Sequence, residues 1–141
     1  MARILVVEDS SAVRAHIRAL LEDAPGLFAK GPGDVPAEVE VVEAASGFDA
    51  LRLLPRGQYD LVITDINMPD INGLELVRFV RESPTHKETP LIIISTDGRD
   101  KDRERGMKLG ASDYLIKPFK PEDLISRARH FLSQASSKTE H

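Results

Sequence analysis

The chain has 141 residues, a length that fits one domain better than two, and 41% of them are hydrophobic, enough for one buried core. Nineteen lysines and arginines against 23 aspartates and glutamates give a net charge of −4, without the basic field that nucleic-acid binders carry. The absence of cysteine excludes a disulfide framework, a cysteine-ligated metal site and thiol catalysis. No apolar stretch approaches the roughly 20 residues of a membrane span. The sequence therefore predicts a cytoplasmic protein with no nucleic-acid and no membrane partner.

Short runs rich in β-branched residues predict five strands, at Arg3–Val7, Val39–Glu43, Asp60–Thr64, Pro90–Ser95 and Asp113–Ile116. Three of these runs are continuously apolar, which is typical of strands that helices cover on both faces of a parallel sheet. Helical patterns separate the strands, at Val13–Leu21, Phe48–Leu54, Asn72–Val80, Arg99–Leu109 and Pro121–Leu132. The first has Ser10 or Ser11 as its cap, and the second has Ser46. Strict alternation of strands and helices predicts a doubly wound α/β sheet with right-handed crossovers.

Two segments fall outside this alternation. Residues 24–38 contain three prolines and three glycines and are longer than the two to six residues usual for such a connection. They are predicted to be an inserted loop, either tolerated at the surface or used for docking through Leu27 and Phe28. Residues 133–141 are predicted to be a polar C-terminal tail. The predicted domain therefore covers residues 1–132, and no output domain is expected after it.

Polar residues gather where four of the predicted strands end. In chain order they are Glu8 and Asp9, Asp65 with Asn67, Ser95 with Thr96, and Lys117. Each one alone is also explained as a turn, a cap or a solvated residue. Ligands of open α/β sheets bind beyond the carboxyl ends of the strands, so we expect one shared site. Three carboxylates repel one another unless a cation neutralises them, and oxygen ligands without histidine or cysteine suit Mg²⁺. A carboxylate beside such an ion can attack phosphorus, with a lysine and hydroxyl groups holding the phosphoryl oxygens.

Over residues 2–132 the chain resembles the receiver domain of two-component response regulators. The segments that carry the resemblance are Val6–Asp9, Asp65–Pro69 with Gly73, Ile94–Thr96, Gly110–Tyr114 and Lys117–Phe119. The resemblance implies a flavodoxin-like fold, with five parallel strands in the order 2-1-3-4-5 and five helices. It also implies a signalling switch rather than an enzyme, one that catalyses only its own phosphorylation and dephosphorylation.

The resemblance implies roles for the acidic residues. Asp65 would accept a phosphoryl group from a histidine kinase. Mg²⁺ would be held by Glu8, Asp9, Asp65 and the backbone carbonyl of Asn67. Asn67 and Asp97 would tune how fast the resulting acyl phosphate hydrolyses.

The remaining roles concern the phosphoryl group and the partner. Lys117, Ser95 and Thr96 would contact the phosphoryl group, and Ser95 with Tyr114 would be the switch pair. The downstream protein would dock on the face formed by the fourth helix, the fifth strand and the fifth helix. That face carries the charge run Arg99–Lys108.

Two functions fit these residues, and two others lack a residue or loop that they need. The first is a stand-alone switch that changes its affinity for a protein partner, as in chemotaxis or motility signalling. The second is a shuttle that passes the phosphoryl group to a histidine phosphotransfer protein. A haloacid-dehalogenase-like phosphatase would need an acid at the position of Asn67, which argues against it. A small-molecule binder would need a glycine-rich loop after the first strand, where Glu8–Ser11 stands instead.

Overall fold

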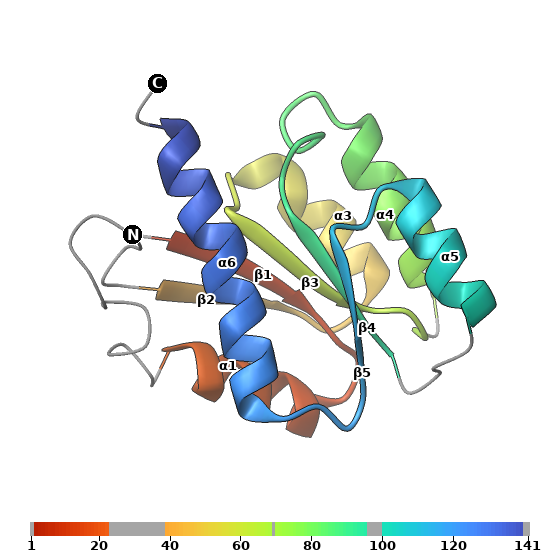
Figure 1. Cartoon of the computed structure of the whole chain (residues 1–141). Coiled ribbons are helices and arrows are strands. Elements are labelled where there is room, and N and C mark those ends of the chain that lie inside the picture. The colour runs from red at the N-terminus through yellow and green to blue at the C-terminus, as the bar shows by residue number, and fades with distance from the viewer. Residues whose placement is uncertain (1, 23–38, 69, 96–99, 140–141) are drawn as a thin grey trace.

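The computed structural model describes residues 2–22, 39–68, 70–95 and 100–139, which form a sheet between two layers of helices (Figure 1). The strands are parallel and lie in the order β2-β1-β3-β4-β5. Their bounds are Ala2–Val7 for β1, Val39–Ala44 for β2, Leu61–Asp65 for β3, Leu91–Ser95 for β4 and Asp113–Ile116 for β5. The predicted flavodoxin-like fold and its strand order are confirmed. The predicted insertion, residues 24–38, lies outside the described residues.

Helices cover both faces of the sheet. On one face lie α1 (Ser11–Glu22) and α6 (Pro121–Thr139). On the other face lie α3 (Gly47–Leu53), α4 (Gly73–Glu82) and α5 (Asp100–Leu109) (Figure 1). The 3₁₀ turn η1 (Leu54–Arg56) extends α3, because Pro55 lacks the N–H that an α-helical continuation would need. Helix α6 continues as far as Thr139, through most of the segment predicted to be a tail.

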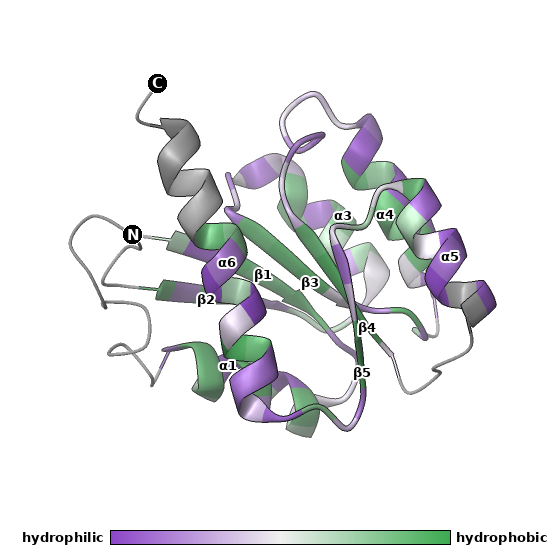
Figure 2. Cartoon of the chain, viewed as in Figure 1, coloured by the Kyte–Doolittle hydropathy of each residue, from purple (hydrophilic) through white to green (hydrophobic). Residues whose placement is uncertain are grey.

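The core is divided by the sheet into two clusters, because successive strand residues point to opposite faces. Ile63 and Ile92 pack with α1 and α6, whereas their neighbours Val62 and Ile93 pack with α3 and α4. All four side chains are fully buried. Figure 2 shows the apolar strands between helices whose outer surfaces are polar. Burial on both faces is the physical reason for the continuous apolar runs in the sequence.

Three helices begin at the residues that the sequence predicts. Ser10 Oγ accepts a hydrogen bond from the backbone N–H of Val13 (3.3 Å), so Ser10 rather than Ser11 caps α1. Ser46 Oγ accepts one from Asp49 (3.1 Å) at the start of α3. Asn72 caps α4 in the same way. Each cap satisfies a backbone donor that a helix start leaves free.

Helix α5 confirms the charged fourth helix and shows how it packs. Apart from Gly106, every residue of α5 whose burial is described is exposed. A Cβ atom at Gly106 would lie 2.7 Å from Ile93 Cδ1, so the missing side chain lets the helix backbone approach β4 closely. None of the helices in the described part of the chain has the length and apolar character that crossing a bilayer requires.

Candidate functional site: an acidic pocket at the carboxyl ends of the strands

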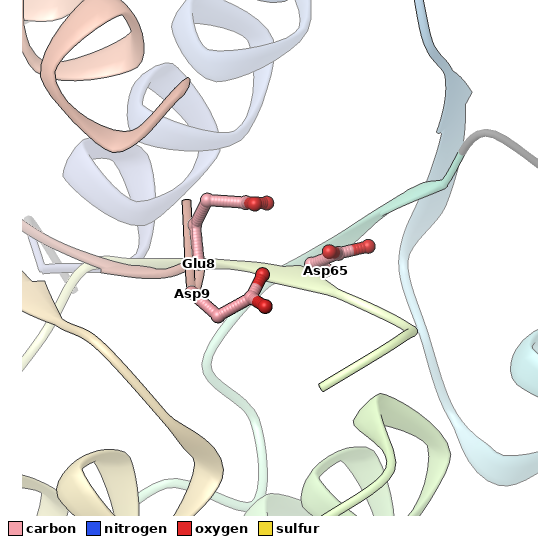
Figure 3. A group of neighbouring side chains, drawn as sticks. All are labelled: Glu8, Asp9 and Asp65. Atoms are coloured by element: carbon pink, nitrogen blue, oxygen red, sulfur yellow. The ribbon is translucent and has the colours of Figure 1, made fainter. Parts of the chain in front are cut away.

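Three carboxylates meet where β1 and β3 end (Figure 3). Glu8 and Asp9 directly follow β1, and Asp65 is the last residue of β3. One oxygen from each carboxylate lies within 4.8 Å of the others. Figure 3 shows Glu8 and Asp9 extending from the end of β1 toward the side of Asp65. Glu8 and Asp65 are buried, at 2% and 6% exposure, while Asp9 is exposed.

The ammonium group of Lys117 enters this cluster from the end of β5. Its Nζ lies 2.9 Å from Glu8 Oε2 and 3.6 Å from Asp65 Oδ2. The backbone N–H of Lys117 donates to Ser95 O (2.7 Å), which joins the ends of β4 and β5, and the following bond to Pro118 is cis. Among the described residues, three carboxylates therefore gather at the pocket, and the ammonium group contacts two of them. An excess of negative charge on hard oxygen donors fits a divalent cation such as Mg²⁺.

The loop after Asp65 folds back tightly over the end of its own strand. The N–H of Asn67 donates to Asp65 Oδ1 (3.3 Å), and the N–H of Gly73 donates to Ile66 O (2.9 Å). A Cβ atom at Gly73 would lie 2.4 Å from Asp65 O, so only glycine allows this approach of the start of α4. The loop thus holds the Asn67 backbone beside the Asp65 carboxylate.

The two predicted switch residues lie on neighbouring strands. Ser95 is fully buried at the end of β4, and Tyr114, 5% exposed, belongs to the core cluster under α3 and α4. Thr96 and Asp97 lie outside the described residues, as does Pro69. The roles of Ser95, Thr96, Tyr114 and Asp97 therefore stay predictions.

Comparison with known proteins agrees with this geometry. The family model for the response regulator receiver domain matches residues 34–129. The chain belongs to this family. The resemblance stated from the sequence is thereby confirmed. Receivers generally act as signalling switches that interact with histidine kinases, and phosphoryl-aspartate and Mg²⁺ are typical of them.

Proteins similar to this chain include a chemotaxis regulator, a transcriptional regulator and a phosphodiesterase response regulator. The chemotaxis response regulator CheY4 of Vibrio cholerae is 32% identical, with a TM-score of 0.79 over 94% of this chain and 99% of that one. The transcriptional regulatory protein DltR of Streptococcus agalactiae is 37% identical, and the match covers 95% of this chain and 53% of DltR. The cyclic di-GMP phosphodiesterase response regulator RpfG of Xanthomonas campestris is 30% identical over 92% of this chain and 31% of RpfG.

The receiver thus spans about a third to a half of the curated relatives it matches. Relatives named as transcriptional regulatory proteins mean that the predicted exclusion of a nucleic-acid partner is not supported.

Burial shapes the electrostatics of the pocket. It raises the pKa of Glu8 above its ordinary value; the hydrogen bond from Lys117 opposes this shift, and the nearby Asp65 carboxylate adds to it. Because the folded protein holds this proton more tightly than the unfolded chain, stability falls as the pH rises from the unfolded pKa through the raised one. The ionised Glu8 that a cation needs is therefore a cost to the folded state at neutral pH.

We expect Glu8→Gln to raise the melting temperature of the Mg²⁺-free receiver at pH 7, because the buried charge is removed. The gain should shrink as the pH falls through the raised pKa, where the wild-type carboxyl is already neutral. Mg²⁺ affinity should fall by about tenfold or more. Thermal melts and Mg²⁺ titrations between pH 5 and pH 8 measure both effects.

Asp9→Asn, at an exposed position, should weaken Mg²⁺ binding with little change in melting temperature. A lower melting temperature of Glu8→Gln at pH 7 would contradict the stated cost.

One residue of the pocket's surroundings is not apparent in the sequence patterns. Arg14, in the first turn of α1, donates from Nη1 to the backbone carbonyl of Glu8 (2.8 Å) and from Nε to Glu43 Oε1 (2.9 Å). It thus fixes the peptide between Glu8 and Asp9 and links it to the end of β2. The only available signal was an arginine one turn into the helix that follows an acidic pair.

Proposed function

We propose that this receiver accepts a phosphoryl group on Asp65 from the phosphohistidine of a kinase and thereby changes its affinity for a downstream protein. The observation that carries the proposal is the convergence of Glu8, Asp9 and Asp65 within 4.8 Å, with Lys117 Nζ beside two of them. The family to which the chain belongs supports the same reading.

The residues of the pocket have separate proposed roles in phosphoryl transfer and in Mg²⁺ binding. The Asp65 carboxylate forms the new O–P bond as the N–P bond to the donor imidazole breaks, and the imidazole leaves with a proton from solvent. Lys117 and the hydroxyl groups of Ser95 and Thr96 are proposed to hold the phosphoryl oxygens. Glu8, Asp9, Asp65 and the carbonyl of Asn67 would hold Mg²⁺. When bound, the ion neutralises the acidic pocket and the charge of the transferred group.

The direct test is labelling of the intact receiver with acetyl phosphate. We expect Mg²⁺-dependent incorporation of one phosphoryl group that hydroxylamine removes, since acyl phosphates react with hydroxylamine. Phosphotransfer profiling against the histidine kinases of the source organism then identifies the donor. Labelling that proceeds equally in the presence of a chelator would contradict the proposal.

Lys117→Ala separates the lysine's two possible roles. Removing a positive neighbour should leave Mg²⁺ affinity unchanged or raise it by less than about threefold, because the carboxylates lose a competing cation. The rate of phosphoryl labelling should fall by about tenfold or more. Lys120→Ala, at an exposed position nearby, is the matched control. A tenfold loss of Mg²⁺ affinity with normal labelling would make Lys117 structural instead.

The proposed output surface is the face formed by α5, β5 and α6. A shallow pocket of about 420 Å³ on α5 is lined by Arg103, Glu104, Met107 and Lys108, and Met107 is 43% exposed. Ile116 of β5 is also exposed, at 44%. Apolar side chains among alternating charges favour a protein partner whose encounter depends on electrostatics.

Reversing Arg103 and Arg105 to glutamate should slow association with the downstream protein by about tenfold at low salt. The defect should shrink as added salt shortens the screening length. Stopped-flow mixing at several salt concentrations measures the association rate. The two components are the beryllofluoride-loaded receiver and the downstream protein that binds to it. Reversal of Arg52 and Arg78, which are exposed on α3 and α4, changes the net charge equally and is the control. Normal association of the Arg103/Arg105 variant at low salt would move the contact elsewhere.

A further inference from the structure

A carboxylate outside the acidic pocket ties the loop after Asp65 to the start of α3. Asp70 lies in the segment that joins β3 to α4. Its Oδ1 accepts from the N–H of Gly47 (3.1 Å), and its Oδ2 accepts from the N–H of Phe48 (2.9 Å). These are the first two residues of α3, and the N–H of the third, Asp49, donates to Ser46 Oγ. One aspartate of the loop thus completes the N-terminus of a helix 22 residues earlier in the chain.

Packing joins the same two segments independently of these hydrogen bonds. A Cβ atom at Gly47 would lie 2.6 Å from Ile71 Cβ and 3.3 Å from Ile71 O. The backbone of α3 therefore lies directly against the loop, with no room for a side chain between them. The loop and the start of α3 form one contact surface.

The charge of Asp70 makes the link persistent. Backbone donors, that of Phe48 above all, lower the pKa of Asp70 to about 2. The carboxylate is therefore ionised at every pH at which the receiver works. Charge-assisted hydrogen bonds of this kind are stronger than those between neutral groups.

The residues at the two ends of the loop contact Asp65. Asn67 N donates to Asp65 Oδ1, and Gly73 packs against Asp65 O. Both ends of the loop thus contact Asp65, and Asp70 between them contacts α3. A displacement of the Asn67 backbone has to be taken up within a few residues or passed to α3.

We propose that Asp70 is a positioning residue of the acidic pocket, which holds the Asn67 carbonyl in place and couples occupation of the pocket to α3. The inference rests on the proposed function, because it assumes that Asn67 and the three carboxylates hold Mg²⁺. Phe48, 62% exposed in the first turn of α3, would then lie on a second surface that changes with the state of the pocket. Linkage makes the coupling reciprocal: if the Asp70 contacts raise cation affinity by a given factor, cation binding favours those contacts by the same factor.

The chain contains no tryptophan, so Phe48→Trp provides a single fluorescent probe at an exposed site. We expect its emission to change when Mg²⁺ and beryllofluoride are added. In Phe48→Trp/Asp70→Asn the change should be lost, and Mg²⁺ should bind about threefold to tenfold more weakly. Phe48→Trp/Asp49→Asn is the control, because Asp49 lies in the same turn but contacts Ala45 and Arg52 rather than the loop. Urea unfolding of each variant verifies that the binding measurements are made on folded protein.

Hydrogen exchange on the unmodified chain tests the coupling even where Asp70→Asn does not fold. Exchange at the amides of Gly47 and Phe48 should slow on Mg²⁺ binding, by a factor similar to the loss of Mg²⁺ affinity in Asp70→Asn. Unchanged exchange at both amides, or an Asp70→Asn variant with normal Mg²⁺ affinity and a normal fluorescence change, would overturn the inference alone. A parent chain that binds no Mg²⁺ by calorimetry would overturn the proposed function, and this inference with it.

Discussion

Asp65→Asn is expected to reduce phosphoryl labelling by acetyl phosphate by about 100-fold or more, because an amide oxygen is a far weaker nucleophile than a carboxylate. The change preserves the size of the side chain, and Asp65 is 6% exposed with Lys117 Nζ at 3.6 Å. The loss should therefore come from the missing nucleophile rather than from unfolding. Intact-mass measurement of the labelled fraction, beside a thermal melt, separates the two causes.

Two further variants complete this experiment. Asp9→Asn keeps the nucleophile and removes one proposed metal ligand, so it should label normally at saturating Mg²⁺ but require more of the ion. Asp123→Asn, exposed in the first turn of α6, should label like the wild type. Robust labelling of Asp65→Asn would show that another residue accepts the phosphoryl group.

The fold and the acidic pocket could be predicted because they depend on local signals. Continuous apolar runs such as Ile92–Ile94 mark strands buried on both faces, and Ser46 and Asn72 mark helix starts. Parallel strands bring their carboxyl ends to one edge of the sheet. The convergence of Glu8 and Asp65 therefore followed from their places after two strands, without knowledge of any contact.

The contacts that support the pocket could not be predicted, because they join residues that are distant in sequence. Asp70 reads as an ordinary turn residue, and nothing local indicates that its acceptors meet α3. Arg14 reads as a solvated helix residue, although it binds the carbonyl of Glu8. Helix α5 has too few apolar residues for a periodicity argument, and its packing depends on the missing side chain of Gly106. Tertiary structure decides each of these cases.

A single arginine joins three segments on the far side of the molecule from the acidic pocket. Arg81, in the last turn of α4, donates from Nε to Gly110 O (2.8 Å) and from Nη1 to Thr89 O (2.6 Å). Longer bonds reach Lys87 O (3.2 Å) and Ser112 Oγ (3.4 Å). The end of α4, the connection to β4 and the turn before β5 are thereby held together at the starts of two strands.

The turn before β5 requires a glycine at position 110. Gly110 has a φ of +116°, in the region that favours glycine, and a Cβ atom there would lie 2.8 Å from Arg81 Cγ. The stem of Arg81 thus covers the glycine, while its guanidinium binds the glycine's carbonyl. Burial lowers the pKa of Arg81, and the carbonyl and hydroxyl oxygens that accept its hydrogen bonds are uncharged. The favourable hydrogen bonds are offset in part by the cost of burying the charge.

Arg81→Met keeps the stem and removes every donor, so it should leave the carbonyls of Gly110 and Thr89 without these partners. We expect the free energy of unfolding to fall by about 2–4 kcal/mol. For a domain of this size, that corresponds to a melting temperature roughly 6–12 °C lower. Arg78→Met is the matched control on the same helix, because the Arg78 side chain is 72% exposed and pairs with the exposed Glu82. Its cost should stay below about 0.5 kcal/mol.

Urea unfolding measures both variants, and folded Arg81→Met should still label at Asp65, since the arginine lies at the opposite edge of the sheet. Equal midpoints for the two variants would mean that the burial cost of the guanidinium cancels its hydrogen bonds, and that packing of the stem alone holds the turn.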